Sequence, residues 1–235
     1  MSIVFIISAP SGSGKSTLVN EVRRVVPALE FSVSYTTRPP RGSEQNGREY
    51  YFVGRADFID MQRHDELLEW AEVYGYYYGT ARRFLREAEQ KGHDLVLDID
   101  VQGAKQVRTL PQGVGIFILP PDRKTLEWRL RNRGVDAPDV IERRLKEAAR
   151  EIENYCEYDY ILVNDQLEES IEKLKAIVLS ERLIRSGKAL SPEEAVLVQR
   201  AERCRLSNAR ERIQRILDSF TAPDDPENEM QGEES

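Results

Sequence analysis

Cysteine and histidine are scarce in this 235-residue chain, which has two of each. Cys156 and Cys204 lie far apart, and neither they nor His64 and His93 have the spacing of a metal-ligand set. The sequence therefore excludes a disulfide-built fold and a cysteine–histidine zinc site. Such sparing use of cysteine fits a reducing compartment, and we expect a cytoplasmic protein.

Long apolar runs and an excess of positive charge are also lacking. The N-terminal apolar run "IVFII" has only five residues and no basic residue before it, so it fits neither a secretory signal nor a membrane span. The formal net charge is -7, which argues against a nucleic-acid-binding surface spread over the whole molecule. We expect no membrane partner and no nucleic-acid partner, and any anion site must be local.

Four apolar runs have the character of buried strands, at residues 3–7, 93–100, 115–121 and 158–165. Helical patterns separate them, notably over residues 123–132 and 138–153. This alternation predicts an α/β fold with an open parallel sheet of P-loop type and helices on both faces. A Pro/Gly-rich segment between strand patterns, over residues 31–53, indicates an inserted lobe of mixed strands and helices.

The stretch "SAPSGSGKST" follows the first strand and opens a helix, the context of the phosphate-binding loop G-x-x-x-x-G-K-[ST]. Backbone N–H groups of such a loop point at a polyphosphate, and Gly12 and Gly14 permit the tight turns. Lys15 would reach the transferred phosphoryl group, and Ser16 would ligate Mg²⁺. Ala9 replaces the first glycine, which costs little unless this position needs a positive φ. The alternative is a turn that merely links the strand to the helix. The predicted ATP-binding residues of the loop are Ala9, Pro10, Ser11, Gly12, Ser13, Gly14, Lys15, Ser16 and Thr17.

A second anion site is indicated downstream, where Arg38 and Arg41 flank two prolines. Two guanidinium groups and the hydroxyl of Tyr50, with Ser34 nearby, make a clamp suited to a monophosphate, because arginine binds phosphate through paired hydrogen bonds. Two phosphate sites in one chain predict phosphoryl transfer between them. A solvated basic loop is the alternative.

Five motifs recur in the order and spacing of one enzyme family, namely "SAPSGSGKSTL", "SVSYTTRPPRGSEQNGREYYFV", "LLEWAEVYGYYYGT", "LDIDVQGAKQV" and "YILVND". Through them the chain resembles the guanylate kinases over residues 3–186. The resemblance implies a P-loop nucleoside monophosphate kinase with a core, a GMP-binding lobe and a mobile lid. Such an enzyme transfers the γ-phosphoryl group of ATP to GMP or dGMP, with Mg²⁺ as cofactor. Two alternatives stay open: a guanylate-kinase-like protein-binding module without catalysis, and a kinase that acts on another base.

The same resemblance implies the roles of individual residues. Glu69 and Thr80 would read guanine, since a carboxylate accepts from N1–H and the exocyclic amine while a hydroxyl donates to O6. Asp98 and Asp100 would lie near guanine and the Mg²⁺ water shell, with a capping role as the alternative for either. The implied GMP-binding set is Ser34, Arg38, Arg41, Tyr50, Glu69, Tyr78, Thr80, Asp98 and Asp100. Asn164 would lie near adenine. The implied catalytic set is Lys15, Arg38, Arg129, Arg133 and Arg144.

We expect residues 1–186 to form the guanylate-kinase-like domain, with its core at 1–33, 81–122 and 154–186, its GMP-binding lobe at about 34–80 and its lid at about 123–153. A helical extension follows at 187–220, in which Ser191 and Pro192 predict the start of one helix that continues to Phe220. Its apolar stripe would dock on the body or pair with a second copy of the chain, and a solvated helix is the alternative. We expect the Pro- and acid-rich tail, 221–235, to be disordered.

Overall fold

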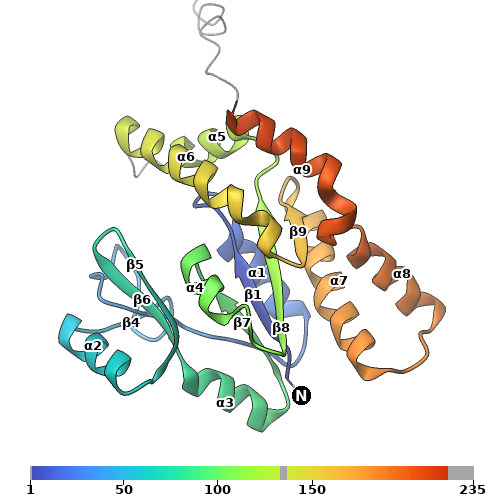
Figure 1. Ribbon diagram of the computed structural model, residues 1–235, viewed down its shortest axis with the longest axis horizontal. Helices are drawn as coiled ribbons and strands as arrows, with labels where there is room; N and C mark the ends of the chain where they lie inside the picture. The colour runs from blue at the N-terminus through green and yellow to red at the C-terminus, as the bar shows by residue number, and fades with distance from the viewer. Residues whose placement is uncertain (1, 133–136, 222–235) are drawn as a thin grey trace, which may run out of the picture.

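The computed structural model describes residues 2–132 and 137–221, and its central layer is a five-stranded sheet (Figure 1). All four strand pairings in this sheet are parallel. Its order is β2 (Leu29–Phe31), β7 (Asp94–Asp98), β1 (Val4–Ser8), β8 (Gly113–Leu119) and β9 (Tyr160–Val163). The parallel sheet predicted from the apolar runs is therefore confirmed.

The central strand β1 is buried on both faces, which explains its continuous apolar sequence. Phe5 and Ile7 belong to the hydrophobic cluster on one face, whereas Val4 and Ile6 belong to the cluster on the other. Side chains alternate along a strand, so a strand covered on both sides needs apolar residues at every position. Helices α1 (Lys15–Val25) and α7 (Leu167–Ser186) cover the first face, and α3 (Arg82–Lys91) and α4 (Val101–Val107) cover the second.

A second, mixed sheet forms a lobe beside the central sheet, as the inserted segment predicts (Figure 1). Its strands, in order, are β4 (Tyr51–Phe52), β3 (Tyr35–Thr36), β6 (Tyr76–Ala81) and β5 (Leu67–Val73), and helix α2 (Arg55–Arg63) precedes β5 in the chain. The β5–β6 and β3–β6 pairings are antiparallel, and the β3–β4 pairing is parallel. We call this sheet with α2 the lobe.

Two helices between β8 and β9 occupy the segment predicted as the lid. They are α5 (Arg123–Asn132) and α6 (Pro138–Ile152), followed by the short 3-10 helix η1 (Glu153–Glu157), and we call α5 and α6 the lid helices. Five apolar side chains of the lid helices form a small cluster of their own, the lid cluster, which consists of Leu126, Leu130, Ile141, Leu145 and Ala148. The lid thus has its own core beside the sheet.

The C-terminal extension contains two helices, α8 (Pro192–Glu202) and α9 (Leu206–Thr221), so the prediction of one helix from 191 to 220 is wrong. The break lies beside the edge strand β9, where the N–H of Ile161 donates to the carbonyl of Cys204 at 2.7 Å. The N–H of Leu206 donates to the carbonyl of Asp159 at 2.9 Å. These bonds to the sheet edge replace helical bonds, and no local breaker residue announces them in the sequence.

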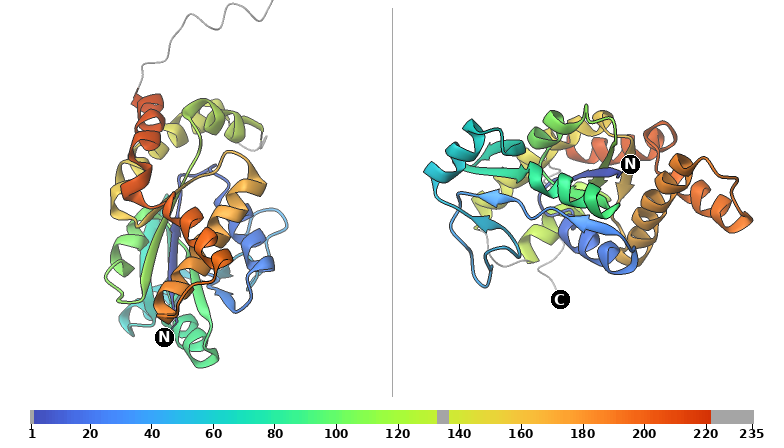
Figure 2. Two further views of the ribbon diagram at one scale, coloured as in Figure 1. Left: turned by 90° about the vertical axis from the view of Figure 1, so that its right-hand side faces the viewer. Right: turned by 90° about the horizontal axis from the view of Figure 1, so that it is seen from below.

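The extension is docked on the body of the same chain. Helix α8 lies against α7, on the side of the molecule opposite to the lobe (Figure 2). Helix α9 contacts β9 and both lid helices and buries Ala209, Ile213 and Ile216 (Figure 1). Intramolecular docking was one of the two expectations for the apolar stripe, and the solvated alternative does not hold.

Two predictions fall outside the described residues, namely the catalytic role of Arg133 and the disordered tail, of which Thr221 alone is described, as the last residue of α9. Within the described ranges, no helix combines the length and the apolar character needed to cross a membrane.

Candidate active site

The loop between β1 and α1 has the backbone geometry of a phosphate-binding loop. Gly12 and Gly14 have φ values of 95° and 85°, which only glycine adopts readily. Ala9 is not among the described non-glycine residues with positive φ. The missing first glycine is therefore tolerated, as expected. All of residues 9–17 line a cavity of about 330 Å³ at the N-terminus of α1, where backbone N–H groups and the helix dipole attract anions.

Asn164 holds this loop from behind. Its Nδ2 donates to the carbonyl of Ser13 at 2.7 Å, and the side chain is buried. A Cβ atom on Gly14 would collide with the same Nδ2, so glycine is also required here by the closeness of Asn164. The observed contact is with the loop, and the adenine contact of Asn164 stays a prediction.

Lys15 links the loop to the neighbouring strand β7. Its Nζ forms an ion pair with Asp98, the last residue of β7, and donates to the carbonyl of Ile99 at 3.1 Å. The parallel register of Ile7 with Asp98 brings the carboxyl ends of β1 and β7 together at this point. Ligands of open α/β sheets bind at this edge, so the ammonium group lies where a phosphate would arrive.

Asp100 has the capping role that was its alternative. It is the N-cap of α4, and its Oδ1 accepts from the N–H of Gly103 at 2.8 Å. It nevertheless lines the loop cavity and a larger cavity next to it, and Asp98 lines the larger one.

The larger cavity, of about 850 Å³, gathers most of the residues predicted to bind GMP. Lys15, Ser16, Asp100 and Arg144 line both cavities, so the two are contiguous. Arg38, Thr80, Arg129 and Asn164 are not among the lining residues of the larger cavity. The predicted residues that line it are Lys15, Ser16, Ser34, Arg41, Tyr50, Glu69, Tyr78, Asp98, Asp100 and Arg144.

Glu69 is a carboxylate on the buried face of β5. Leu67 and Ala71 share that face, and Glu69 is only 3% exposed. Burial raises the pKa of Glu69 to about 7, while the adjacent Thr80 hydroxyl opposes the shift. Among the described residues, neither Oε1 of Glu69 nor Oγ1 of Thr80 makes a hydrogen bond of ordinary geometry, although the hydroxyl lies close enough to favour the ionised carboxylate. An acceptor and a hydroxyl are thus buried side by side, across the β5–β6 pairing, without being fully satisfied by the described residues.

Gly103 makes room for this carboxylate, and sequence reasoning missed it. A Cβ atom at position 103 would overlap Oε2 of Glu69. The only signal in the sequence is a glycine inside a helical pattern, which disfavours the helix and so points to a packing reason.

Glu44 is a second functional residue that sequence reasoning missed. Its two carboxylate oxygens accept from Nη1 and Nη2 of Arg38 at 3.0 and 2.9 Å, and Oε2 also accepts from the N–H of Arg41 at 2.7 Å. The Arg38 guanidinium is the main cause that holds the pKa of Glu44 below its usual range. Glu44 therefore fixes the guanidinium of Arg38 and the backbone of Arg41 in the predicted phosphate clamp.

Two tyrosines complete the wall beside the clamp. The rings of Tyr50 and Tyr78 meet edge to face with centroids 5.8 Å apart. Burial, with a further contribution from Asp98, raises the pKa of Tyr50 to about 12, so the phenol stays protonated and can donate. The Arg38 guanidinium carbon lies 5.4 Å from the centre of the Tyr50 ring.

The lid helices contribute Arg129 and Arg144. Nη2 of Arg129 donates to the carbonyls of Asn164 and Asp165 at 2.9 and 3.3 Å. Its Nη1 is buried and, in the part of the chain that the structure describes, has no hydrogen-bond partner, and burial lowers the pKa of the group. The lid also touches the lobe, because the Tyr74 hydroxyl donates to the carboxylate of Glu147.

Glu151 on α6 is a third residue that the motifs did not reveal. It lines the loop cavity, and burial raises its pKa to about 7 although Lys15 opposes the shift. No sequence signal distinguishes it from the solvated glutamates of the same helix.

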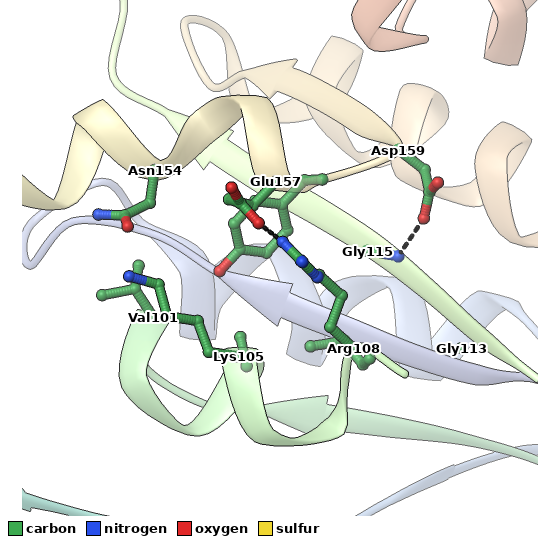
Figure 3. A pocket seen from close by; sticks show the side chains of 11 residues that line it. Val101, Lys105, Arg108, Gly113, Gly115, Asn154, Glu157 and Asp159 are labelled. Carbon is green, nitrogen blue, oxygen red and sulfur yellow. Dashed lines mark hydrogen bonds and ion pairs between the residues drawn. The ribbon is translucent and has the colours of Figure 1, made fainter. Parts of the chain in front are cut away.

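A separate cavity lies between α4, β8 and η1 (Figure 3). Arg108 and Glu157 form an ion pair across it, and Oδ2 of Asp159 accepts from the N–H of Gly115 at 2.8 Å. Its volume of about 30 Å³ is far below the roughly 300 Å³ of small ligand pockets. It does not hold a nucleotide.

Comparisons with known proteins show the family of this chain. The family model for guanylate kinase matches residues 1–181. A guanylate kinase of Koribacter versatilis is 61% identical over 228 residues, which cover 95% of this chain and 98% of the relative. A guanylate kinase of Dechloromonas aromatica is 48% identical over 181 residues, 77% of this chain and 90% of the relative. The crystal structure of guanylate kinase from Anaplasma phagocytophilum superposes with a TM-score of 0.63 at 35% identity, covering 77% of this chain and 86% of that one. The chain therefore belongs to the guanylate kinase family.

Proposed function

We propose that this chain carries out its family's reaction with the residues of the two contiguous cavities. The reaction is transfer of the γ-phosphoryl group of ATP to GMP, which gives ADP and GDP. The smaller cavity, with the phosphate-binding loop, takes ATP, and the larger one takes GMP or dGMP. In this assignment the lobe binds GMP, the lid helices close over both nucleotides, and the central sheet with its helices is the core.

Glu69 carries this proposal. A buried carboxylate with an unpartnered oxygen is costly unless a ligand satisfies it, and the guanine edge offers two adjacent N–H donors. The Thr80 hydroxyl, also unpartnered among the described residues, can donate to guanine O6. Adenine has an acceptor at N1, and its amine lies at the position of guanine O6, which faces Thr80. It would therefore leave Glu69 unpaired.

The clamp beside Glu69 supplies the acceptor phosphate site. The cavity that Glu69 lines is also lined by Arg41, Tyr50, Tyr78 and Ser34. Arg38 does not line it, but its guanidinium lies beside the Tyr50 ring and is held by Glu44. A monophosphate bound there would present an oxygen toward Lys15, which lines both cavities. Positioning of this kind supplies much of the rate enhancement in phosphoryl transfer.

Positive charge around the transferred phosphoryl group supplies the rest of the rate enhancement. Lys15 at the loop and Arg129 and Arg144 on the lid helices would stabilise negative charge on the phosphoryl oxygens, and we assign the same role to Arg38 and Arg133. Closure of the lid helices would exclude water and so limit hydrolysis of ATP.

The oxygen ligands that Mg²⁺ prefers are present at the junction of the two cavities. Ser16 lines both, with Asp98 and Asp100 close by. We assign the metal to the Ser16 hydroxyl directly and to Asp98 or Asp100 through water. When bound, Mg²⁺ neutralises charge on the phosphates of ATP. ATP and GMP are then the small-molecule partners, and a cytoplasmic location stays a prediction.

The test is a pair of variants on the two faces of β5. Glu69→Ala removes the proposed guanine acceptor, whereas Glu72→Ala removes an exposed carboxylate of the same strand. We expect kcat/KM for GMP to fall about ten- to a hundredfold in Glu69→Ala, since an unsatisfied buried partner costs about 1–3 kcal/mol. Glu72→Ala should stay within about twofold of the wild type. Equal values for the two variants in an ADP-release assay would contradict the assignment of Glu69.

A further inference from the structure

The last helix of the chain, α9, joins the sheet edge to the lid helices. It lies outside residues 1–181, which the family model matches. One end is fixed beside β9 by Arg205, whose Nη2 donates to Oε1 of Glu181 at 3.1 Å and whose guanidinium carbon lies 4.5 Å from the centre of the Tyr160 ring. The helix therefore starts from a point attached to the body.

The other end of α9 contacts the first turn of α5. The Ser219 hydroxyl accepts from the backbone N–H of Arg123, the first residue of α5, at 3.1 Å. The same hydroxyl donates to the carbonyl of Ile216 at 2.6 Å, which orients its lone pairs toward α5. The first N–H groups of a helix have no acceptor within that helix. For Arg123 of α5, the acceptor comes from α9.

Phe220 connects two hydrophobic clusters. Its half-buried ring packs both against the lid cluster and against the body cluster that contains Ile213 and Ile216 of α9. Leu217, one turn earlier on α9, packs against the body cluster and not against the lid cluster. Among the side chains of α9, contact with the lid cluster is thus a property of Phe220.

The lid cluster in turn touches the phosphate-binding loop. A Cβ atom on Gly12 would lie 2.8 Å from Leu126 and 2.9 Å from Leu130, so these leucines are seated directly on the loop backbone. Arg129, on the same helix, donates to the carbonyl of Asn164, and Asn164 donates to Ser13 of the loop. Helix α5 therefore reaches the ATP side of the site by two routes.

We propose that α9 positions lid helix α5 on the phosphate-binding loop through Phe220 and Ser219, so that the C-terminal extension sets the geometry of the ATP site. Neither residue lines either of the two cavities, and we regard both as positioning residues. Helix α5 reaches the loop and Arg129, whereas α6, which shares the lid cluster, reaches the lobe through Glu147 and Tyr74. Because Ser219 bonds to α5, loss of the α9 contacts should change the ATP side more than the GMP side. The kinetic part of this inference rests on the proposed assignment of the loop to ATP.

The test compares two single substitutions in the full-length chain. Phe220→Ala removes the contact with the lid cluster, and Leu217→Ala removes an apolar side chain of the same helix that packs against the other cluster and not against the lid cluster. We expect Phe220→Ala to raise KM for ATP about three- to tenfold and to raise KM for GMP by a smaller factor. Leu217→Ala should leave both KM values within about twofold, and Phe220→Leu, which keeps an apolar contact, should recover most of the effect.

Hydrogen exchange of the α5 amides provides a readout that does not depend on activity. In the free protein, Phe220→Ala should speed exchange in α5 relative to β1, and Leu217→Ala should not. Where Phe220→Ala fails to fold, Ser219→Ala is the milder variant, and the Arg123 amide should exchange faster in it. Equal exchange of α5 in Phe220→Ala and Leu217→Ala overturns the proposal. Altered α5 exchange together with an unchanged KM for ATP would place the failure in the assignment of the loop and not in the contact.

Discussion

The carboxylate of Glu69 fills the space that a side chain on Gly103 would need. The two residues come from different layers, since Glu69 lies on β5 of the lobe and Gly103 on α4 of the core. The carboxylate that we propose to read guanine is thus seated against the body of the enzyme, and its position depends on a glycine in a helix.

Gly103→Ala should displace Glu69 and weaken use of GMP. We expect kcat/KM for GMP to fall about ten- to a hundredfold, because a misplaced acceptor leaves the guanine donors and the buried carboxylate unpaired, at about 1–3 kcal/mol. KM for ATP should not change. Gln102→Ala, at an exposed position of the same helix, is the control, and a similar loss in both variants would attribute the effect to α4 itself.

Binding of GMP should release a proton near neutral pH. Burial raises the pKa of Glu69 to about 7 in the free protein, and guanine N–H donors favour the ionised carboxylate. The affinity for GMP should therefore increase as pH rises from about 6 to about 8. Calorimetric titration in buffers of different ionisation enthalpy measures the proton directly. In Glu69→Gln the proton release caused by guanine binding should disappear, and only the proton release that comes from the GMP phosphate should persist.

The same raised pKa has a consequence for stability with the opposite dependence on pH. Between about 4.5, the ordinary value, and about 7, the folded protein holds a proton that the unfolded chain has lost. The free energy of unfolding without ligand should therefore fall as pH rises through this window, by at most about 3 kcal/mol for this group. Glu151, whose pKa burial also raises to about 7, acts in the same direction, so Glu69→Gln should remove only part of the fall.

Glu44→Ala should loosen the phosphate clamp without unfolding the lobe. Arg38 and the N–H of Arg41 would lose their common acceptor, and we expect KM for GMP to rise about ten- to a hundredfold, since one hydrogen bond to a charged group contributes about 1.5–3 kcal/mol. Glu49→Ala, which removes an acceptor for the N–H of Gln45 in the same loop, is the matched control. If KM for ATP rose instead, the clamp would belong to the donor side.

Arg205→Ala should destabilise the whole protein through the contact at the sheet edge. Glu181 is buried, and within the described part of the chain it would keep the Tyr160 hydroxyl, at 2.6 Å, and the more distant Arg185, at 3.8 Å. Because the Arg205 side chain is 31% exposed, solvent screening reduces the loss, and we expect about 1–3 kcal/mol in a denaturant titration. Arg203→Ala, at an exposed position in the same turn, should cost less than about 0.5 kcal/mol. Equal losses would mean that the turn, and not the ion pair, provides the stability.

Local sequence patterns were sufficient for most of the core and for the loop after β1. Continuous apolar runs predicted β1, β7, β8 and β9 but not the short edge strand β2, and the loop's two glycines have the positive φ values that the motif requires. Gly103 and Glu151 were not foreseen, because each acts through a contact between segments distant in sequence. Glu44 was not foreseen although its partners Arg38 and Arg41 are only six and three positions away, because its role depends on how the turn between them folds. The break between α8 and α9 was missed for the same reason as Gly103 and Glu151, since Cys204 and Leu206 bond to the edge of β9 and not within a helix.

The most direct test of the central claim is an ADP-release assay on the wild-type enzyme with GMP, AMP, CMP and UMP as alternative acceptors. The unpartnered pair Glu69 and Thr80 predicts that GMP exceeds AMP in kcat/KM by at least about a hundredfold, as expected for a buried site built to pair with its ligand. AMP turned over as well as GMP, or better, would contradict the account.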